Sequence, residues 1–208
     1  MSLTLYFLRH GETTHSHTDR FCGEMNPELT EVGQEMADAF AVAYAEIPWQ
    51  AVFVSPMRRT VATAKPLCDK VGIEMQLRDG LKECSYGKWE DLSKAEAYER
   101  YGEDYVRWMT EPAWNPPTGG ETAVQVASRA SLVIAEIEKT CTTGNVLVVS
   151  HRSTIRIIVC SLMGIDLGRY RDRIDMPVAA VSVVKFDEYG PLLQRLCDRA
   201  HLPARLRN

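Results

Sequence analysis

The feature that most constrains the fold is an alternation of short apolar runs with longer segments of helical spacing. The apolar runs at residues 3–8, 51–54 and 146–149 are typical of buried strands. Each is followed along the chain by a segment whose apolar residues recur every three or four positions, the spacing of a helix packed on a core. Strands that alternate with helices predict an α/β fold, in which a largely parallel sheet carries helices on both faces and forms the middle of three layers.

The same spacing places the other elements. The predicted helices cover residues 29–47, 56–71, 93–109, 122–140 and 153–163. Alternating apolar and polar residues predict a further strand at 73–77, and a C-terminal hairpin joins 178–186 to 192–196 through the turn 187–190. Because no repeat, low-complexity tract or linker interrupts the pattern, we expect one domain over 1–208.

Composition narrows the class of protein. The chain has 208 residues, 45% of them apolar and 25% charged, as globular domains have. A net charge of −4 disfavours a nucleic-acid binder, and no apolar run approaches the ~20 residues of a membrane span. The 6 cysteines form no Cys-x-x-Cys pair, and the first residues lack the basic start of a signal peptide. We therefore expect a cytoplasmic protein with reduced thiols, whereas its oligomeric state is not predicted.

Polar residues follow three of the predicted strands directly. The block 9–13 (Arg-His-Gly-Glu-Thr) follows the first strand, 55–59 (Ser-Pro-Met-Arg-Arg) the second, and 150–152 (Ser-His-Arg) the run 146–149. Ligands of open parallel sheets bind at the carboxyl ends of the strands, near the N-termini of the following helices. The sequence therefore predicts that histidines and arginines from three distant segments meet at one edge of the sheet.

Such a cluster suits a tetrahedral dianion. Guanidinium groups hold phosphate oxygens bidentately and stay charged at any working pH. A neutral imidazole has a lone pair that can attack phosphorus, and surrounding cations stabilise the equatorial oxygens during the transfer. Expulsion of an alkoxide also requires a general acid, for which a carboxyl group is the natural candidate. These residue types therefore point to phosphoryl transfer.

Short motifs of one family occur in order along nearly the whole chain. They occupy residues 9–13, 20–23, 29–33, 55–64, 81–90, 117–122, 149–151 and 198–202. In this order they resemble the histidine phosphatase superfamily, in its phosphoglycerate mutase-like branch. The resemblance implies the three-layer fold of that branch, with an α/β sheet and a C-terminal hairpin.

The resemblance also implies a role for particular residues. His10 becomes a phosphohistidine, while Arg9, Arg59 and His151 hold the phosphoryl group. Glu83 acts first as the acid and then as the base. No metal or organic cofactor is expected.

Three further residues are assigned to the substrate site, and two of them differ from the residues that the family usually carries. Gly23 belongs to the motif 20–23, and we place it among the substrate-binding residues. Ser16 stands where the mutases usually carry Asn, and its hydroxyl can still donate to phosphate. Arg152 stands where the family usually has a Gly whose backbone approaches the ligand. Its guanidinium either contacts the substrate or forms a structural ion pair, and the sequence leaves both open.

Two other patterns favour a structural interpretation. His10, His15, His17 and Asp19 are close in sequence, but histidines two residues apart before a polar loop make poor metal ligands, so no metal site is expected. The aromatic residues between 98 and 108 recur at three- and four-residue spacing, which predicts the packed face of a helix rather than a binding stripe.

We expect a phosphatase that hydrolyses small phosphate monoesters of metabolites through a phosphohistidine. Alternatives are a cofactor-dependent phosphoglycerate mutase, a phosphoprotein or phosphohistidine phosphatase, and a non-enzymatic module that binds a phosphorylated metabolite. Ser16 and a short segment between Glu83 and the glycines at 119–120 favour a phosphatase over a mutase. The complete set of catalytic residue types argues against a binding module. The substrate is not predicted, although specificity is expected within residues 88–118.

Overall fold

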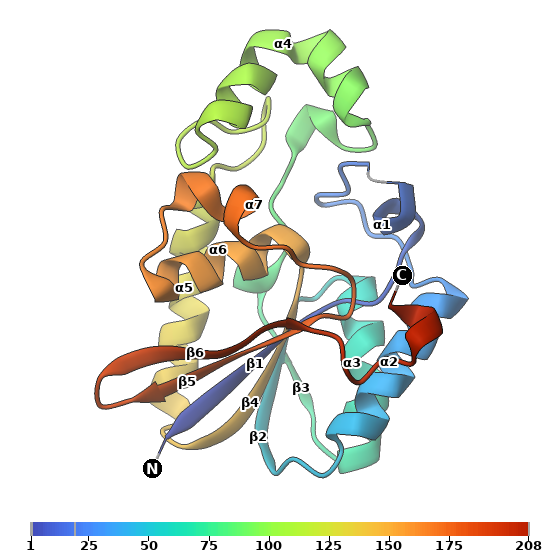
Figure 1. Cartoon of the computed structure of the whole chain (residues 1–208), viewed down its shortest axis with the longest axis vertical. Helices are drawn as coiled ribbons and strands as arrows, with labels where there is room; N and C mark the ends of the chain where they lie inside the picture. Colours follow the sequence, from blue (N-terminus) through green and yellow to red (C-terminus); the bar gives the residue numbers. More distant parts are fainter. Residues whose placement is uncertain (1, 19, 208) are drawn as a thin grey trace.

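A six-stranded sheet forms the centre of the computed structural model, which describes residues 2–18 and 20–207 and leaves the side chain of His17 undescribed. Its strands are β1 (Leu3–Arg9), β2 (Trp49–Val54), β3 (Met75–Leu77), β4 (Gly144–Ser150), β5 (Val181–Asp187) and β6 (Gly190–Asp198). They lie in the order β3-β2-β4-β1-β5-β6. The first four strands in this order are parallel, β5 is antiparallel to β1, and β6 completes the hairpin with β5 (Figure 1).

Helices cover both faces of this sheet. They are α1 (Thr14–Thr18), α2 (Glu31–Tyr44), α3 (Arg58–Val71), α4 (Lys94–Thr110), α5 (Ala123–Thr140), α6 (Arg152–Met163) and α7 (Tyr170–Arg173). α2 and α3 pack together on one face, α5 and α6 on the other, and α4 stands beyond the ends of the strands (Figure 1). The predicted three-layer α/β fold with a C-terminal hairpin is therefore confirmed.

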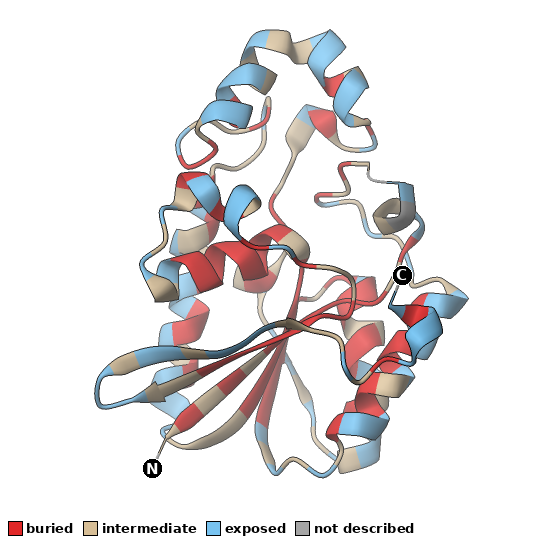
Figure 2. Cartoon of the chain, viewed as in Figure 1, coloured by how far each residue is buried: buried red, intermediate tan, exposed pale blue. Residues whose placement is uncertain are grey.

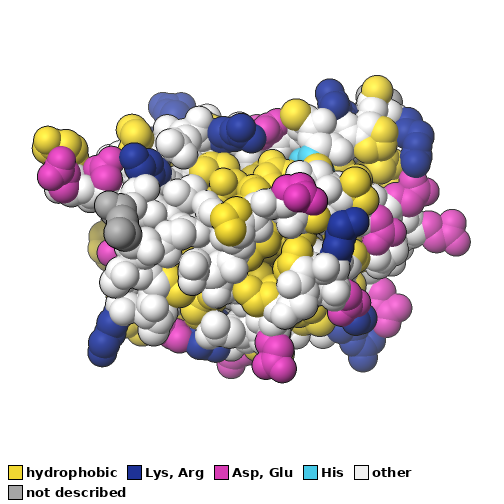
Figure 3. Space-filling view, turned by 90° about the horizontal axis from the view of Figure 1, so that it is seen from below, with side chains coloured by type: hydrophobic (Ala, Val, Ile, Leu, Met, Phe, Trp, Pro, Cys, Tyr) yellow, Lys and Arg dark blue, Asp and Glu magenta, His cyan; other side chains and the backbone are white. Residues whose placement is uncertain are grey.

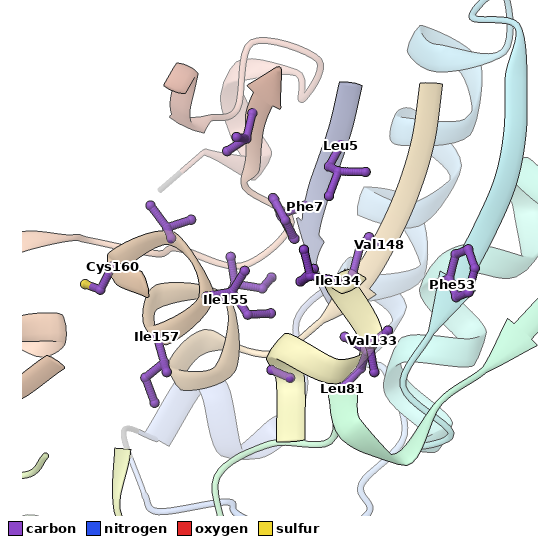
Figure 4. Packing of buried hydrophobic residues seen from close by; sticks show 14 of the residues in the cluster. Leu5, Phe7, Phe53, Leu81, Val133, Ile134, Val148, Ile155, Ile157 and Cys160 are labelled. Carbon is purple, nitrogen blue, oxygen red and sulfur yellow. The ribbon is translucent and has the colours of Figure 1, made fainter. Parts of the chain in front are cut away.

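The side chains of the central strands point alternately to the two faces of the sheet and contribute to two separate hydrophobic cores. In β1, Leu5 and Phe7 join the core under α5 and α6, whereas Leu8 joins the core under α2 and α3. In β4, Val148 faces the first core and Val149 the second, because successive side chains of a strand point to opposite faces. Figure 4 shows Leu5, Phe7 and Val148 packed with Ile134 and Ile155 of the covering helices. Figure 2 shows the central strands buried and much of α4 exposed.

Helix caps explain most differences between predicted and observed boundaries. Thr30 caps α2 by accepting from the Gly33 N–H at 3.0 Å, so the helix predicted from residue 29 begins at Glu31. Ser93 and Thr122 each form a capping box at the start of α4 and α5. Gly164, in the left-handed conformation, ends α6 where the sequence predicts. The four-residue helix α7 is not predicted from the sequence, because it has no amphipathic repeat to detect.

A close backbone approach holds the loop after β1 against the start of α2. A Cβ on Gly11 would lie 2.4 Å from the carbonyl oxygen of Gly33, and a Cβ on Gly33 would lie 2.1 Å from the carbonyl oxygen of Glu12, so neither position tolerates a side chain easily. The Thr30 N–H donates to the Glu12 carbonyl at 3.0 Å, and the Gly11 N–H donates to Oγ1 of Thr63 in α3 at 3.0 Å. These contacts fix the backbone that directly follows His10.

α4 and the preceding loops enclose a small aromatic core of their own. Phe21, Trp89 and Trp108 are buried there, and the Trp89 and Trp108 rings meet edge-to-face at 5.4 Å. The predicted packing of the aromatic residues in α4 is thus confirmed for Trp108, whereas Tyr98 is 58% exposed. α4 bends at Tyr101, whose φ of −134° is not helical.

The face opposite α4 carries charges of both signs. Figure 3, seen from below, shows basic and acidic side chains interspersed around a more hydrophobic centre. None of the helices within residues 2–18 and 20–207 is both long and apolar enough to cross a membrane.

Candidate active site

The carboxyl ends of β2, β4 and β1 are neighbours in the sheet, which brings the three predicted polar blocks together. Backbone bonds extend the pairing past the strand ends. The His10 N–H donates to the Ser150 carbonyl at 3.1 Å, and the Ser55 N–H donates to the Val149 carbonyl at 3.0 Å. The ring centroids of His10 and His151 are consequently 5.3 Å apart.

His10 is held as a neutral imidazole with one defined tautomer. Its side chain is buried, with 5% of the residue exposed, and Nδ1 lies 2.7 Å from the Gly11 carbonyl oxygen. A carbonyl can only accept, so Nδ1 carries the hydrogen and the lone pair is on Nε2. Burial and the guanidinium groups of Arg59 and Arg9 lower the pKa of His10 well below 6.5. His10 is therefore in the form that a nucleophile needs at neutral pH.

Arg59 is anchored through three of its N–H groups. Nε donates to Nδ1 of His151 at 3.1 Å, Nη1 to the Met25 carbonyl at 2.7 Å, and Nη2 to the Gly23 carbonyl at 3.2 Å. A guanidinium has five N–H donors, so one on each Nη is left over from these bonds. Because Arg59 borders the cavity beside His10, these donors suit oxygens of a bound anion.

His151 is fully buried and bonded through both ring nitrogens. Nδ1 accepts from Arg59, so Nε2 carries the hydrogen and donates to Oγ of Ser55 at 2.8 Å. Burial, followed by the charge of Arg59, lowers the pKa of His151 well below 6.5. In this arrangement His151 orients Arg59, and a direct contact of His151 with the phosphoryl group stays a prediction.

Gly23 and Ser16 both border the cavity, where each has a structural bond as well. Gly23 has a φ of +49°, and a Cβ there would lie 2.1 Å from Oε1 of Glu90, so the position favours glycine. Oγ of Ser16 accepts from the Thr13 N–H at 2.8 Å and donates to the Thr13 carbonyl at 2.8 Å. Gly23 thus supports Arg59 through its carbonyl, and the hydroxyl hydrogen of Ser16 is already donated to Thr13.

Glu83 lies at the N-terminus of α6. Its Oε2 accepts from the Ser153 N–H at 3.2 Å, and its Oε1 accepts from the N–H groups of Thr154 at 3.2 Å and Cys84 at 2.9 Å. N–H groups at the start of a helix have no partner within the helix, which explains why a carboxylate settles there. The residue is 7% exposed and borders the same cavity as His10.

Arg9 and Arg152 add charge to this cavity. Arg9 donates through Nη1 to the Met176 carbonyl, and Arg152 is the first residue of α6. Burial and the nearby charge of Arg152 lower the pKa of Arg9 to about 9, and Glu83 partly opposes this shift. The cavity is thus built to receive negative charge.

Within the described residues, no group of three or more His, Cys, Asp or Glu side chains could hold a metal ion. Nε2 of His15 lies 3.3 Å from the carboxylate of Asp91. Asp19 and the side chain of His17 lie outside the described residues. The expected independence from metals and organic cofactors stays a prediction.

The sequence pattern of the histidine phosphatase superfamily, branch 1, matches residues 5–199. The chain belongs to this superfamily. Its relatives include phosphoserine phosphatase 1 of Hydrogenobacter thermophilus, 29% identical over 198 residues that cover 95% of this chain and 93% of that protein. Another is a 2,3-bisphosphoglycerate-dependent phosphoglycerate mutase of Rhizobium etli, 34% identical over 169 residues, or 78% of this chain and 80% of that one.

Solved structures share the fold. Bacillus stearothermophilus YhfR superposes with a TM-score of 0.89 at 23% identity, covering 96% of this chain and 98% of that one. Membership of the superfamily and the fold of its mutase-like branch, both expected from the motifs, are therefore confirmed.

Sequence reasoning missed part of the cation cluster in this histidine phosphatase. The cavity is also lined by Arg20, Lys94, Arg156, Arg171 and Arg199. One of these has a signal in the sequence, because Arg156 follows Arg152 by four residues and therefore lies on the same side of α6. The others come from segments whose proximity depends on the path of the chain across the ends of the strands.

Proposed function

We propose that this histidine phosphatase hydrolyses small phosphate monoesters of metabolites through a phosphohistidine on His10. The observation that carries the proposal is the buried neutral imidazole of His10, with its lone pair on Nε2 beside the guanidinium groups of Arg9 and Arg59. A neutral nucleophile among fixed cations can attack phosphorus while the cations stabilise the charge on the transferred group.

The first transfer forms the phosphoenzyme. Nε2 of His10 attacks phosphorus in line with the ester oxygen, the P–N bond forms and the P–O bond to the alcohol breaks. Glu83, entering this step protonated, gives its proton to the departing oxygen, so that an alcohol rather than an alkoxide leaves.

The second transfer returns the enzyme to its starting state. The Glu83 carboxylate accepts a proton from water, and the oxygen of that water attacks phosphorus as the P–N bond breaks. Inorganic phosphate leaves, and Glu83 is protonated for the next cycle. Arg9 and Arg59 hold the phosphoryl group in both steps, His151 acts by orienting Arg59, and Ser16, Gly23 and Arg152 lie around the substrate. No metal or organic cofactor takes part.

Relatives support both the phosphatase and its nearest alternative. A phosphoserine phosphatase matches over almost the full length of the chain, while a phosphoglycerate mutase is somewhat more identical over a shorter part. In a mutase the phosphoryl group of His10 would pass to a bound glycerate instead of to water. Ser16 and the short segment between Glu83 and residues 119–120 favour water as the acceptor.

A labelling experiment tests the proposal. After incubation with a ³²P-labelled monoester in the presence of a chelator and quenching without acid, the label should be acid-labile, base-stable and located on His10. His10→Ala should abolish both label and phosphate release. Label that persists in His10→Ala would refute the mechanism, and label discharged to glycerate faster than to water would identify a mutase.

A further inference from the structure

Two arginines that the phosphoryl transfer does not require project from the first turns of α6. Arg152 and Arg156 are four residues apart, so their side chains lie one above the other on the same side of the helix, and both border the cavity. Arg156 is 7% exposed, and its Nε has no hydrogen-bond acceptor among the described residues. Nη2 of Arg156 lies 3.5 Å from the carboxylate of Asp175, whose side chain is 80% exposed.

This placement is electrostatically unfavourable in the absence of a ligand. Like charges four residues apart on a helix repel each other, and a cation at a helix N-terminus opposes the helix dipole. Burial and the charge of Arg152 lower the pKa of Arg156, and Arg152 and Arg156 both lower the pKa of Arg9. Glu83 beside Arg9 and the exposed Asp175 beside Arg156 offset part of this positive charge, and an anion bound between the two arginines of α6 would offset more of it.

The cavity also has room beyond the phosphoryl group. Its volume is about 660 Å³, within the range of pockets that hold small organic ligands. Arg9 and Arg59 lie at the strand ends beside His10, whereas Arg152 and Arg156 lie along α6. Tyr105 and Trp108 of α4 border the same cavity, and Arg171 of α7 lies over the Trp108 ring at 3.8 Å.

We propose that Arg152 and Arg156 form a subsite for a second anionic group of the substrate, a carboxylate or another phosphate separate from the one transferred. The inference rests on the proposed function, since it names the class of monoester that the same cavity accepts. Arg171 and Trp108 border the same cavity. The substrate is then a doubly anionic phosphomonoester rather than a simple alkyl or aryl phosphate.

Competitive inhibitors test the subsite without turnover. Propylphosphonate, 3-phosphonopropionate and propane-1,3-bisphosphonate share a short chain and differ in the second group. With p-nitrophenyl phosphate as substrate, we expect a Ki about ten- to a hundredfold lower for one or both doubly anionic compounds than for propylphosphonate, the range of a charge-assisted hydrogen bond. The better of the two identifies carboxylate or phosphate as the second group.

Variants test whether Arg152 and Arg156 cause the preference for doubly anionic inhibitors. Arg152→Ala and Arg156→Met should each reduce the preference for the doubly anionic inhibitor about ten- to a hundredfold, and Arg156→Lys should retain part of it. Arg173→Ala is the matched control, because this arginine of α7 is exposed and does not border the cavity. Thermal unfolding of every variant identifies any that fails to fold. If Arg156→Met does not fold, the inhibitor preferences of Arg156→Lys and Arg152→Ala test the subsite.

The outcomes separate this inference from the proposed function. Equal inhibition by all three phosphonates, or an unchanged preference in folded Arg152→Ala and Arg156→Lys, overturns the subsite. If the enzyme nevertheless forms a phosphohistidine on His10 from p-nitrophenyl phosphate, the proposed function stands. If no phosphohistidine forms in the unmodified enzyme, the proposed function itself fails.

Discussion

Nε of Arg59 donates a hydrogen bond to Nδ1 of His151 at 3.1 Å, and this bond determines what both residues can do. It helps to orient the Arg59 guanidinium, which borders the cavity, and it fixes the hydrogen of His151 on Nε2, which is bonded to Ser55. We therefore expect His151 to act on the phosphoryl group through Arg59 in this arrangement.

A double-mutant cycle distinguishes this indirect role from direct contact. His151→Ala should lower kcat/KM roughly a hundredfold, because a displaced guanidinium no longer matches the phosphoryl oxygens. If His151 acts through Arg59, the variant carrying both His151→Ala and Arg59→Ala should lose no more than Arg59→Ala alone. Losses that multiply in the double variant would show instead that His151 contacts the phosphoryl group independently.

Glu83→Gln tests the general acid. Removal of such a group typically costs ~10²–10⁴-fold in rate. The loss should be far larger for an alkyl phosphate than for p-nitrophenyl phosphate in the phosphorylation step, because nitrophenolate leaves without protonation. Single-turnover phosphorylation of His10 measures this step directly. Equal losses with both substrates would argue against proton donation by Glu83.

The pH dependence of phosphorylation should reflect the environment of His10. Its pKa is lowered well below 6.5 by burial and by Arg59 and Arg9, so the nucleophile remains unprotonated through mildly acidic solution. With p-nitrophenyl phosphate, we expect kcat/KM for the free enzyme to show no acidic limb at the usual histidine pKa. Replacing Arg59 with Gln removes a neighbouring positive charge and should move any acidic limb toward higher pH. An acidic limb near 6.5 in the unmodified enzyme would contradict this environment.

Gly23→Ala should impair activity more than stability. The residue has a φ of +49°, which side chains rarely adopt, and a Cβ would collide with the side chain of Glu90, so we expect the strained loop to draw its carbonyl away from Nη2 of Arg59. We expect kcat/KM to fall about ten- to a hundredfold, the range for a bond to a charged group. Gly102→Ala in α4 is the control, since its Cβ would meet nothing within 4 Å and Ala favours a helix. Comparable losses in both variants would show that the effect is not specific to Gly23.

Strand ends explain why so much of the candidate site is predictable from sequence. His10, Arg59 and His151 follow apolar strands directly, and parallel strands in one sheet bring their carboxyl ends together whatever their separation along the chain. Glu83 is different, since no strand ends at it and only the family motif singles it out. Its position depends on N–H groups of α6, a tertiary contact about 70 residues away in sequence.

The remainder of the cavity depends on the path of irregular segments. Arg171 and Arg199 reach it from α7 and from the chain after β6, neither of which has a periodic pattern that predicts its direction. The two hydrogen bonds of the His151 ring, to Arg59 and to Ser55, are not predictable from the sequence either, because the partner of each ring nitrogen depends on side-chain orientation. Local pattern thus predicts the elements, whereas hydrogen-bond partners require the assembled fold.

His201 provides a test of stability at acidic pH. Its ring packs edge-on against Phe40 and Tyr44, each with centroids 5.6 Å away, and neither ring nitrogen has a hydrogen-bond partner among the described residues. Burial is the main cause that lowers the pKa of His201 from 6.5 to about 4. Between these values the unfolded chain binds a proton that the folded protein does not. The free energy of unfolding therefore falls as pH decreases through this window and is fully present above it.

Replacing His201 with Phe removes this titration while keeping an aromatic ring against Phe40 and Tyr44. We expect the midpoint of urea unfolding to decrease less between pH 7 and pH 4.5 in His201→Phe than in the unmodified protein. Some decrease should remain, because burial also lowers the pKa of His10 and His151. A variant whose midpoint changes with pH as steeply as that of the unmodified protein would show that His201 does not titrate below its ordinary range in the folded state.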